Sequence, residues 1–124
     1  MPFTTGIITS TRAVGTAASN VVVSIHNVSG ASATVIVEVF GVPITTLALT
    51  PLYVTSYVIP AGASDIREFF IAGNVAYEVQ FSNLSSLSEL VCSTYGLDQF
   101  GNLVTEQRVL QSEMTPISAL SLPI

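Results

Sequence analysis

Short runs of alternating apolar and polar residues cover most of this chain, and turn-forming residues separate them. Alternation with a period of two is typical of a β-strand that buries one face. The most regular run extends from Val75 to Ser82 (VAYEVQFS). We predict that it is a central strand whose odd-numbered residues face the core and whose even-numbered residues face outward.

Two further runs with the same period lie near the start of the chain. Asn20 to Val28 and Ala33 to Val42 are rich in valine, and the small residues of Ser29 to Ser32 separate them. This arrangement predicts a β-hairpin. Gly41 and Pro43 are expected to end the second strand.

The remaining runs fit the same scheme. Residues 44 to 50 predict a weak strand or a loop, DQFGN predicts a hairpin loop, and the tail from 112 to 124 predicts a last edge strand. Further strands are expected at Leu52 to Ile59, Ser64 to Ala72, Glu89 to Leu97 and Leu103 to Leu110. About eight to nine short antiparallel strands without a credible helix indicate an all-β sandwich of immunoglobulin-like or jelly-roll type.

The first nineteen residues differ from the rest of the chain. They alternate like a strand and then enter a segment of small residues, so we predict an N-terminal arm at 1–19 and a sandwich domain at 20–124. The segment of small residues is the expected hinge and consists of Gly15, Thr16, Ala17, Ala18 and Ser19. The apolar side chains available for insertion into a sheet are Phe3 and Ile7 in one register and Ile8 and Val14 in the other.

The arm has two possible partners. It can pair within its own sheet, or it can donate a strand to the sheet of a neighbouring subunit. A few inserted side chains contribute roughly 1.5 to 3 kcal/mol each, whereas ordering the backbone costs about 1 to 2 kcal/mol per residue. Assembly through the arm would therefore need additional contact between the bodies of the subunits.

The charge composition excludes some partners. Only 9% of the 124 residues are charged, lysine is absent, and the net charge is −5. The three basic residues, Arg12, Arg67 and Arg108, are too few and too scattered for a nucleic-acid interface. Such a weakly charged surface favours association.

The residues that could perform chemistry are few. His26 is the one histidine and Cys92 the one cysteine, which predicts a protein that is not an enzyme and has no metal, no cofactor and no internal disulfide. Asp98, Asn102 and Glu106 lack the dense acidic pattern of a calcium loop, and we interpret them as ordinary turn residues.

A binding function remains an alternative. Tyr53 and Tyr57 lie four residues apart on one predicted strand, and Tyr95 lies near the last hairpin, so aromatic stacking on a carbohydrate is possible in principle. The alternative class is therefore a non-catalytic carbohydrate-binding or adhesive sandwich, or a viral capsid or decoration protein. No apolar run is long enough to span a membrane, and the first residues do not show the basic and apolar regions of a signal peptide.

The chain resembles the small all-β subunits of endospore appendages and related surface filaments of spore-forming Gram-positive bacteria. The resemblance lies in the opening VVVSIHNVSGASATVIVEVFGV, the PAGAS turn, the NVAYEVQF strand and the closing STYGLDQFGNLVTEQRVLQSEMTPI, over roughly residues 20 to 117. It implies an extracellular or spore-surface homopolymer in which an N-terminal arm donates a strand to the next subunit. Those subunits carry cysteines in the N-terminal connector, and this arm has none, so the resemblance implies a fibre without disulfide links.

Overall fold

The computed structural model describes residues 2–12, 15–85 and 88–122 and contains two antiparallel sheets packed face to face. One sheet has the order β10-β1-β7-β4-β5, with β2 also paired to β7, and the other has the order β6-β3-β8-β9. The elements are β1 (Phe3–Thr4), β2 (Ile8–Thr9), β3 (Asn20–Asn27), β4 (Ala33–Pro43), β5 (Thr50–Ile59), β6 (Ser64–Phe70), β7 (Asn74–Asn83), β8 (Leu90–Leu97), β9 (Leu103–Val109), the 3-10 turn η1 (Gln111–Glu113) and β10 (Thr115–Pro116). The predicted all-β sandwich is confirmed.

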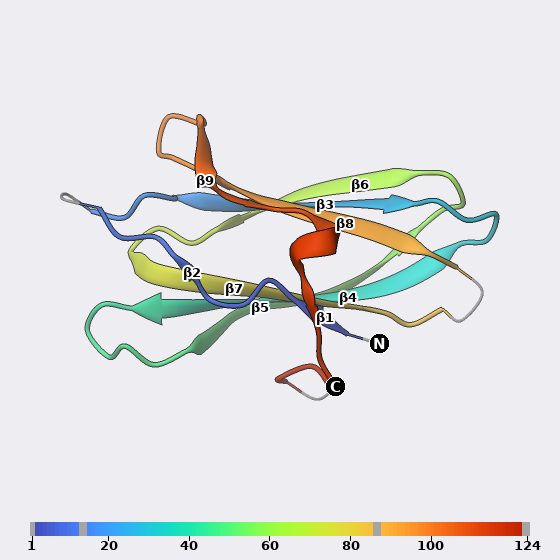
Figure 1. The fold of residues 1–124 in the computed structure, drawn as a ribbon, viewed down its shortest axis with the longest axis horizontal. Helices are drawn as coiled ribbons and strands as arrows, with labels where there is room; N and C mark the ends of the chain where they lie inside the picture. The colour runs from blue at the N-terminus through green and yellow to red at the C-terminus, as the bar shows by residue number, and fades with distance from the viewer. Residues whose placement is uncertain (1, 13–14, 86–87, 123–124) are drawn as a thin grey trace.

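Figure 1 shows the two layers and the chain ends beside them. The strands β6, β3, β8 and β9 form the upper layer, and β7, β4 and β5 form the lower layer (Figure 1). The arm with β1 and β2 runs along β7, and the red segment after β9 descends from the upper layer to pair with β1 (Figure 1). The arm and the tail therefore meet at one edge of the lower sheet.

The core lies between the two layers and consists mainly of valine and isoleucine. The inward rows come from β3, β4 and β7, as the alternation predicts, and most of their side chains are completely buried. They comprise Val21, Val23, Ile25, Val35, Val37, Val39, Tyr77, Val79 and Phe81. The strand β7 lies between β1 and β4, so its predicted central position is confirmed.

The predicted hairpin of the first two long strands is wrong. β3 pairs with β6 and β8, whereas β4 pairs with β5 and β7 in the other sheet. The turn between them is a corner from one sheet to the other, and the Asn27 side chain holds it by donating to the carbonyls of Ala31 and Ile59, at 2.8 and 3.0 Å. Because both strands bury one apolar row, they pack face to face as readily as they would pair edge to edge.

The predicted break at Gly41 is wrong, whereas β4 does end at Pro43, as predicted. β4 continues to Pro43 with a register shift after Val39 against β5 and another after Val42 against β7. A Cβ atom on Gly41 would overlap the Asn74 side chain, so this glycine permits a close approach within the strand.

The last third of the chain follows the predictions closely. β8 and β9 form the expected hairpin, and Asp98 holds its turn by accepting hydrogen bonds from the amides of Phe100 and Asn102, both at 2.9 Å. The tail contains an edge strand, β10, which is only two residues long. In the described residues, no helix is long and apolar enough to cross a membrane.

Gly96 offers a test of the packing around Gln107, between the neighbouring strands β8 and β9. A Cβ atom at this position would overlap the side chain of Gln107, which is buried and hydrogen-bonded to Tyr77. We expect Gly96→Ala to lower the free energy of unfolding by about 1 to 3 kcal/mol. Gly30→Ala is the matched control, because a Cβ atom there would have no neighbour within 4 Å. Urea unfolding followed by circular dichroism measures both, and equal stability of the two variants would contradict this packing.

Candidate functional site: the N-terminal arm and its groove

The arm pairs with its own sheet in the single chain. β1 and β2 run antiparallel to β7, with Phe3 opposite Phe81 and Ile8 opposite Tyr77. Between the two short strands, the Thr5 amide donates to the Val79 carbonyl at 3.0 Å. Of the two pairings that the sequence leaves open, the intramolecular one is therefore present here. The division between arm and sandwich at residue 19 stays a prediction.

Gly6 interrupts the alternation of the arm. Its φ of 72° is in the left-handed region. The register of β2 against β7 is shifted by one residue relative to the register of β1 against β7. As a result, Phe3 and Ile8 pack against the core, whereas Ile7 is 63% exposed. Simple alternation would have grouped Phe3 with Ile7. Val14 lies outside the described residues.

The arm lies in a groove, by which we mean the edge of β7 from Ala76 to Phe81 that β1 and β2 cover. The ring of Phe3 contacts this groove through an aromatic pair. It stacks on Phe81 with a centroid distance of 5.6 Å and an interplanar angle of 18°. Ile8 is partly buried against the same core cluster. The role of these side chains between subunits stays a prediction.

The predicted hinge is tied to the sandwich over most of its length. Thr11 and Thr16 form an isolated bridge, so the chain reverses between them, with Gly15 exposed at a φ of 71°. Ala18 is completely buried. Hydrogen bonds link Ala17 to Ser10, and Ser19 to Leu97 and Ile71. The hinge role of Gly15 to Ser19 stays a prediction.

Gln107 on β9 connects the arm to both sheets. Its Oε1 accepts a hydrogen bond from the Tyr77 hydroxyl at 2.8 Å, and its Nε2 donates to Thr9 O and Ser10 Oγ, both at 3.2 Å. Burial raises the pKa of Tyr77 above its usual range, so the hydroxyl stays protonated and donates. Nothing in the sequence pattern indicated this contact.

The C-terminal tail covers the other edge of the arm. β10 pairs with β1, and the Ile117 amide donates to the Pro2 carbonyl at 2.9 Å. Further along, Ser121 exchanges two hydrogen bonds with Gln80, and the Leu122 amide donates to the Glu38 carboxylate at 3.2 Å. The even-numbered residues of β7 do point outward, yet most of them are buried. The tail contacts Gln80 through Ser121, and the arm contacts Glu78 through Thr4.

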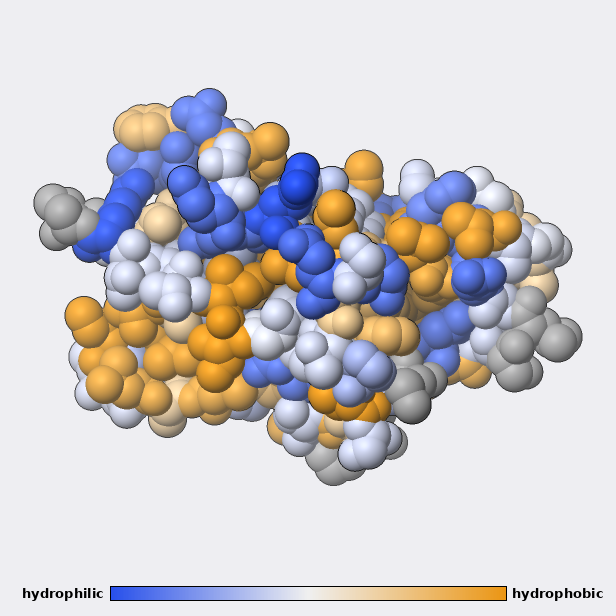
Figure 2. Space-filling view, viewed as in Figure 1, coloured by the Kyte–Doolittle hydropathy of each residue, from blue (hydrophilic) through white to orange (hydrophobic). Residues whose placement is uncertain are grey.

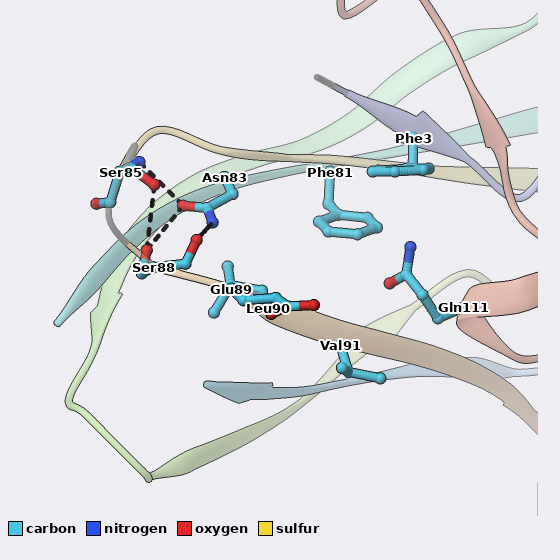
Figure 3. Close-up of a pocket in the computed structure, with 9 residues that line it drawn as sticks. All are labelled: Phe3, Phe81, Asn83, Ser85, Ser88, Glu89, Leu90, Val91 and Gln111. Atoms are coloured by element: carbon cyan, nitrogen blue, oxygen red, sulfur yellow. Dashed lines mark hydrogen bonds between the residues drawn. The ribbon is translucent and has the colours of Figure 1, made fainter. Parts of the chain in front are cut away.

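The groove continues beyond Phe3 as a space that the arm does not fill. A cavity of about 460 Å³ lies there, with Phe3 and Phe81 on one side and Leu90 and Val91 on the other (Figure 3). Asn83 closes the far end by hydrogen bonds to Ser85 and Ser88 (Figure 3). The arm therefore occupies only part of the space along β7.

The structure does not assemble a catalytic or metal site from the candidate residues. His26 is exposed, whereas Cys92, which pairs with the neighbouring Ile25 position, points into the core and is completely buried. Strand alternation therefore places the two on opposite faces. Among the described residues, no group of three His, Cys, Asp or Glu side chains could hold a metal ion.

The three tyrosines considered for carbohydrate binding do not form one surface. Tyr53 packs against Phe69 at a centroid distance of 5.1 Å, and its hydroxyl donates to the Phe70 carbonyl. The ring of Tyr57 is covered by the Arg67 guanidinium, 3.6 Å from its centroid. Tyr95 lies in the other sheet beside a separate hollow of about 300 Å³.

Comparison with known proteins provides no family for this chain. No protein-family model, curated protein or solved structure matches it. Its function is therefore argued from the arm, the groove and the tail.

Phe3 and Ile7 form a matched pair for testing how the arm docks. We expect Phe3→Ala to weaken docking by about 1 to 3 kcal/mol, because the ring stacks on Phe81. Ile7→Ala should change it by less than about 0.5 kcal/mol, since the side chain is exposed. Hydrogen exchange of residues 2–10, measured by mass spectrometry, reports docking. Equal effects of the two substitutions would contradict the observed facing of the arm.

Cys92 offers a test of the core through its thiol. Burial raises its pKa from 9.0 to about 12, so the folded chain keeps the proton that the unfolded chain releases above 9.0. This thiol contributes stability that is present below pH 9.0 and is lost as the pH rises toward about 12. At neutral pH, a disulfide reagent should modify the native protein at least about a hundredfold more slowly than the urea-unfolded protein. Rapid modification of the native protein would contradict a buried Cys92.

Proposed function

We propose that this chain is a structural subunit that self-assembles into an extracellular or spore-surface filament by exchanging its N-terminal arm. In the assembly, the arm of one copy would occupy the groove beside β7 of the next copy. The observation that carries the proposal is the way the arm is held. It docks through two strands of two residues each, two core-facing side chains and a few further hydrogen bonds, and it joins the sandwich through a chain reversal.

The contacts of the arm do not by themselves favour its own groove over the groove of a neighbour. An exchanged arm makes the same contacts in a neighbour's groove as in its own, so these contacts cancel between the two states. The balance then depends on the reversal between Thr11 and Thr16, on subunit concentration and on contact between the bodies. Assembly is accordingly expected to depend on concentration.

The strand directions restrict how two copies can lie. Thr9 pairs with Ala76 near the start of β7, and Asn20 at the start of β3 pairs with Phe70 and Leu97 near the same end of the sandwich. We call this the hinge end. Thr11 and Thr16 can separate by about 17 Å when the five-residue span is extended, so the hinge ends of donor and acceptor must lie close together. Sandwiches arranged side by side satisfy this, and repetition of one such contact produces an open filament unless the rotation closes a ring.

The surface offers apolar area for contact between bodies. At the hinge end, the β4–β5 loop exposes Ile44 and Leu47 to 68% each. Figure 2 shows a broad hydrophobic region at the lower left, on the side where Figure 1 places this loop. Few charges oppose such a contact, since the whole chain has three basic and eight acidic residues.

The proposed extracellular or spore-surface location follows from the composition and from the resemblance to surface-filament subunits. A chain without lysine offers few sites to trypsin-like proteases, which suits an exposed location. The one cysteine is buried, so the proposed filament is held by strand pairing and packing without a covalent link.

Deleting residues 1–15 tests the need for the arm. We expect the full chain to form filaments in negative-stain electron microscopy and the truncated chain to form none, because the groove beside β7 then has no donor. A synthetic peptide of residues 1–12 should fill the empty groove and restore the stability of the truncated chain without restoring filaments. Filaments of unchanged form from the truncated chain would sink the proposal.

A cysteine pair distinguishes exchanged arms from intramolecular ones. Thr9 and Ala76 lie opposite each other on β2 and β7, so a Thr9→Cys/Ala76→Cys variant should form a disulfide on mild oxidation. In assembled protein, we expect a ladder of covalent multimers on a non-reducing gel. The Thr9→Cys variant alone is the control and should give no ladder. If only monomers carry the bond in assembled samples, the arm is not exchanged.

A further inference from the structure

The tail after η1 closes over the arm along its whole first strand. β1 lies between β7 and β10, with Phe3 opposite both Phe81 and Pro116. The Ile117 amide also holds the carbonyl of Pro2. If the arm leaves while the tail stays in place, its contacts with β10 break as well as those with β7.

The outer face of the sheet anchors the rest of the tail. Gln80 Nε2 donates to Ser121 Oγ at 2.7 Å, and the Ser121 amide donates back to Gln80 Oε1 at 2.9 Å. The same Gln80 Nε2 donates to Glu78 Oε2 at 3.0 Å, and Glu78 Oε2 also accepts from the Thr4 hydroxyl of the arm. One polar network thus links the tail, β7 and the arm.

Glu38 makes the closed tail costly. Its side chain is completely buried, one carboxylate oxygen accepts from the Leu122 amide, and the other has no hydrogen-bond partner among the residues that the structure describes. A buried carboxylate without full hydrogen bonding opposes burial. The cover is thus held by a few hydrogen bonds against an electrostatic cost.

We propose that the C-terminal tail, residues 115–122, is a latch that holds the arm in its own groove, and that release of the tail permits the arm to leave. The consequence for assembly rests on the proposed arm exchange. The latch itself is a property of the single chain. It is measurable whether or not filaments form.

The pH dependence follows from the group beneath the latch. Burial raises the pKa of Glu38 above its usual 4.5, an effect that the Leu122 amide only partly offsets. Protonation of Glu38 therefore favours the closed latch, and this contribution is lost as the pH rises through the raised pKa. Glu78 on β7 is the acidic group linked to the same network, while β5 and the described part of the tail carry no carboxylate, histidine or basic side chain.

Hydrogen exchange of residues 2–10 measures opening of the latch. We expect Ser121→Ala to accelerate this exchange about two- to tenfold, because the buried Gln80 loses one partner. Ser118→Ala, at an exposed serine of the same tail, is the matched control and should leave the rate unchanged. A chain truncated after Ile117 should accelerate exchange further. Unchanged rates in both Ser121→Ala and the truncated chain would overturn the latch.

A second variant tests the group beneath the tail. Glu38→Gln cannot ionise, so its arm should keep a constant protection factor from acid to neutral pH, whereas the protection of the wild-type arm should fall as the pH rises. Equal pH dependence of the two proteins would overturn the role of Glu38.

The oxidised Thr9→Cys/Ala76→Cys protein separates the latch from the proposed function. Both proposals are supported if Ser121→Ala accelerates hydrogen exchange of residues 2–10 in the wild-type background and increases the covalent multimers in the oxidised double-cysteine background. If it accelerates exchange but multimers never form, the latch stands and arm exchange between subunits fails.

Discussion

The structure depends on the pairing of both edges of β7. This strand presents core side chains on its inner face, and its buried main-chain groups need hydrogen-bond partners on both sides. β4 covers one edge over nearly the whole length of the strand, whereas the other edge depends on the arm. Any state in which the arm leaves must therefore supply another strand. That requirement is consistent with the proposed exchange of the arm between copies.

The two ends of the chain depend on each other through this edge. The arm provides β1 as an edge for β10, and β10 leads into the segment that buries Glu38 and Gln80. The polar outer face of a sheet would ordinarily contact water, and here the tail replaces that water with a few specific hydrogen bonds. The buried carboxylate of Glu38 keeps this replacement only moderately favourable.

The short docking of the N-terminal arm and the weakly charged surface act together in the proposed assembly. Exchange of the arm alone gains no contact, so the additional stability has to come from apolar side chains such as Ile44 and Leu47 at the hinge end. The strand directions place this end next to the point where an exchanged arm would cross. Lysine, whose hydrated charge protects many exposed sheet edges from pairing, is absent from the chain.

The sequence by itself determined the strands and most of their faces, because the alternation of residues such as Val75 to Ser82 is local and a buried face needs apolar side chains. It could not assign β3 and β4 to different sheets, since two apolar rows suit edge pairing and face packing equally. The alternation also did not predict the one-residue shift in register at Gly6, which turns Ile8 inward and Ile7 outward. The tertiary structure alone decided the cover over Glu38 and Gln80, because residues more than forty positions away in sequence supply it.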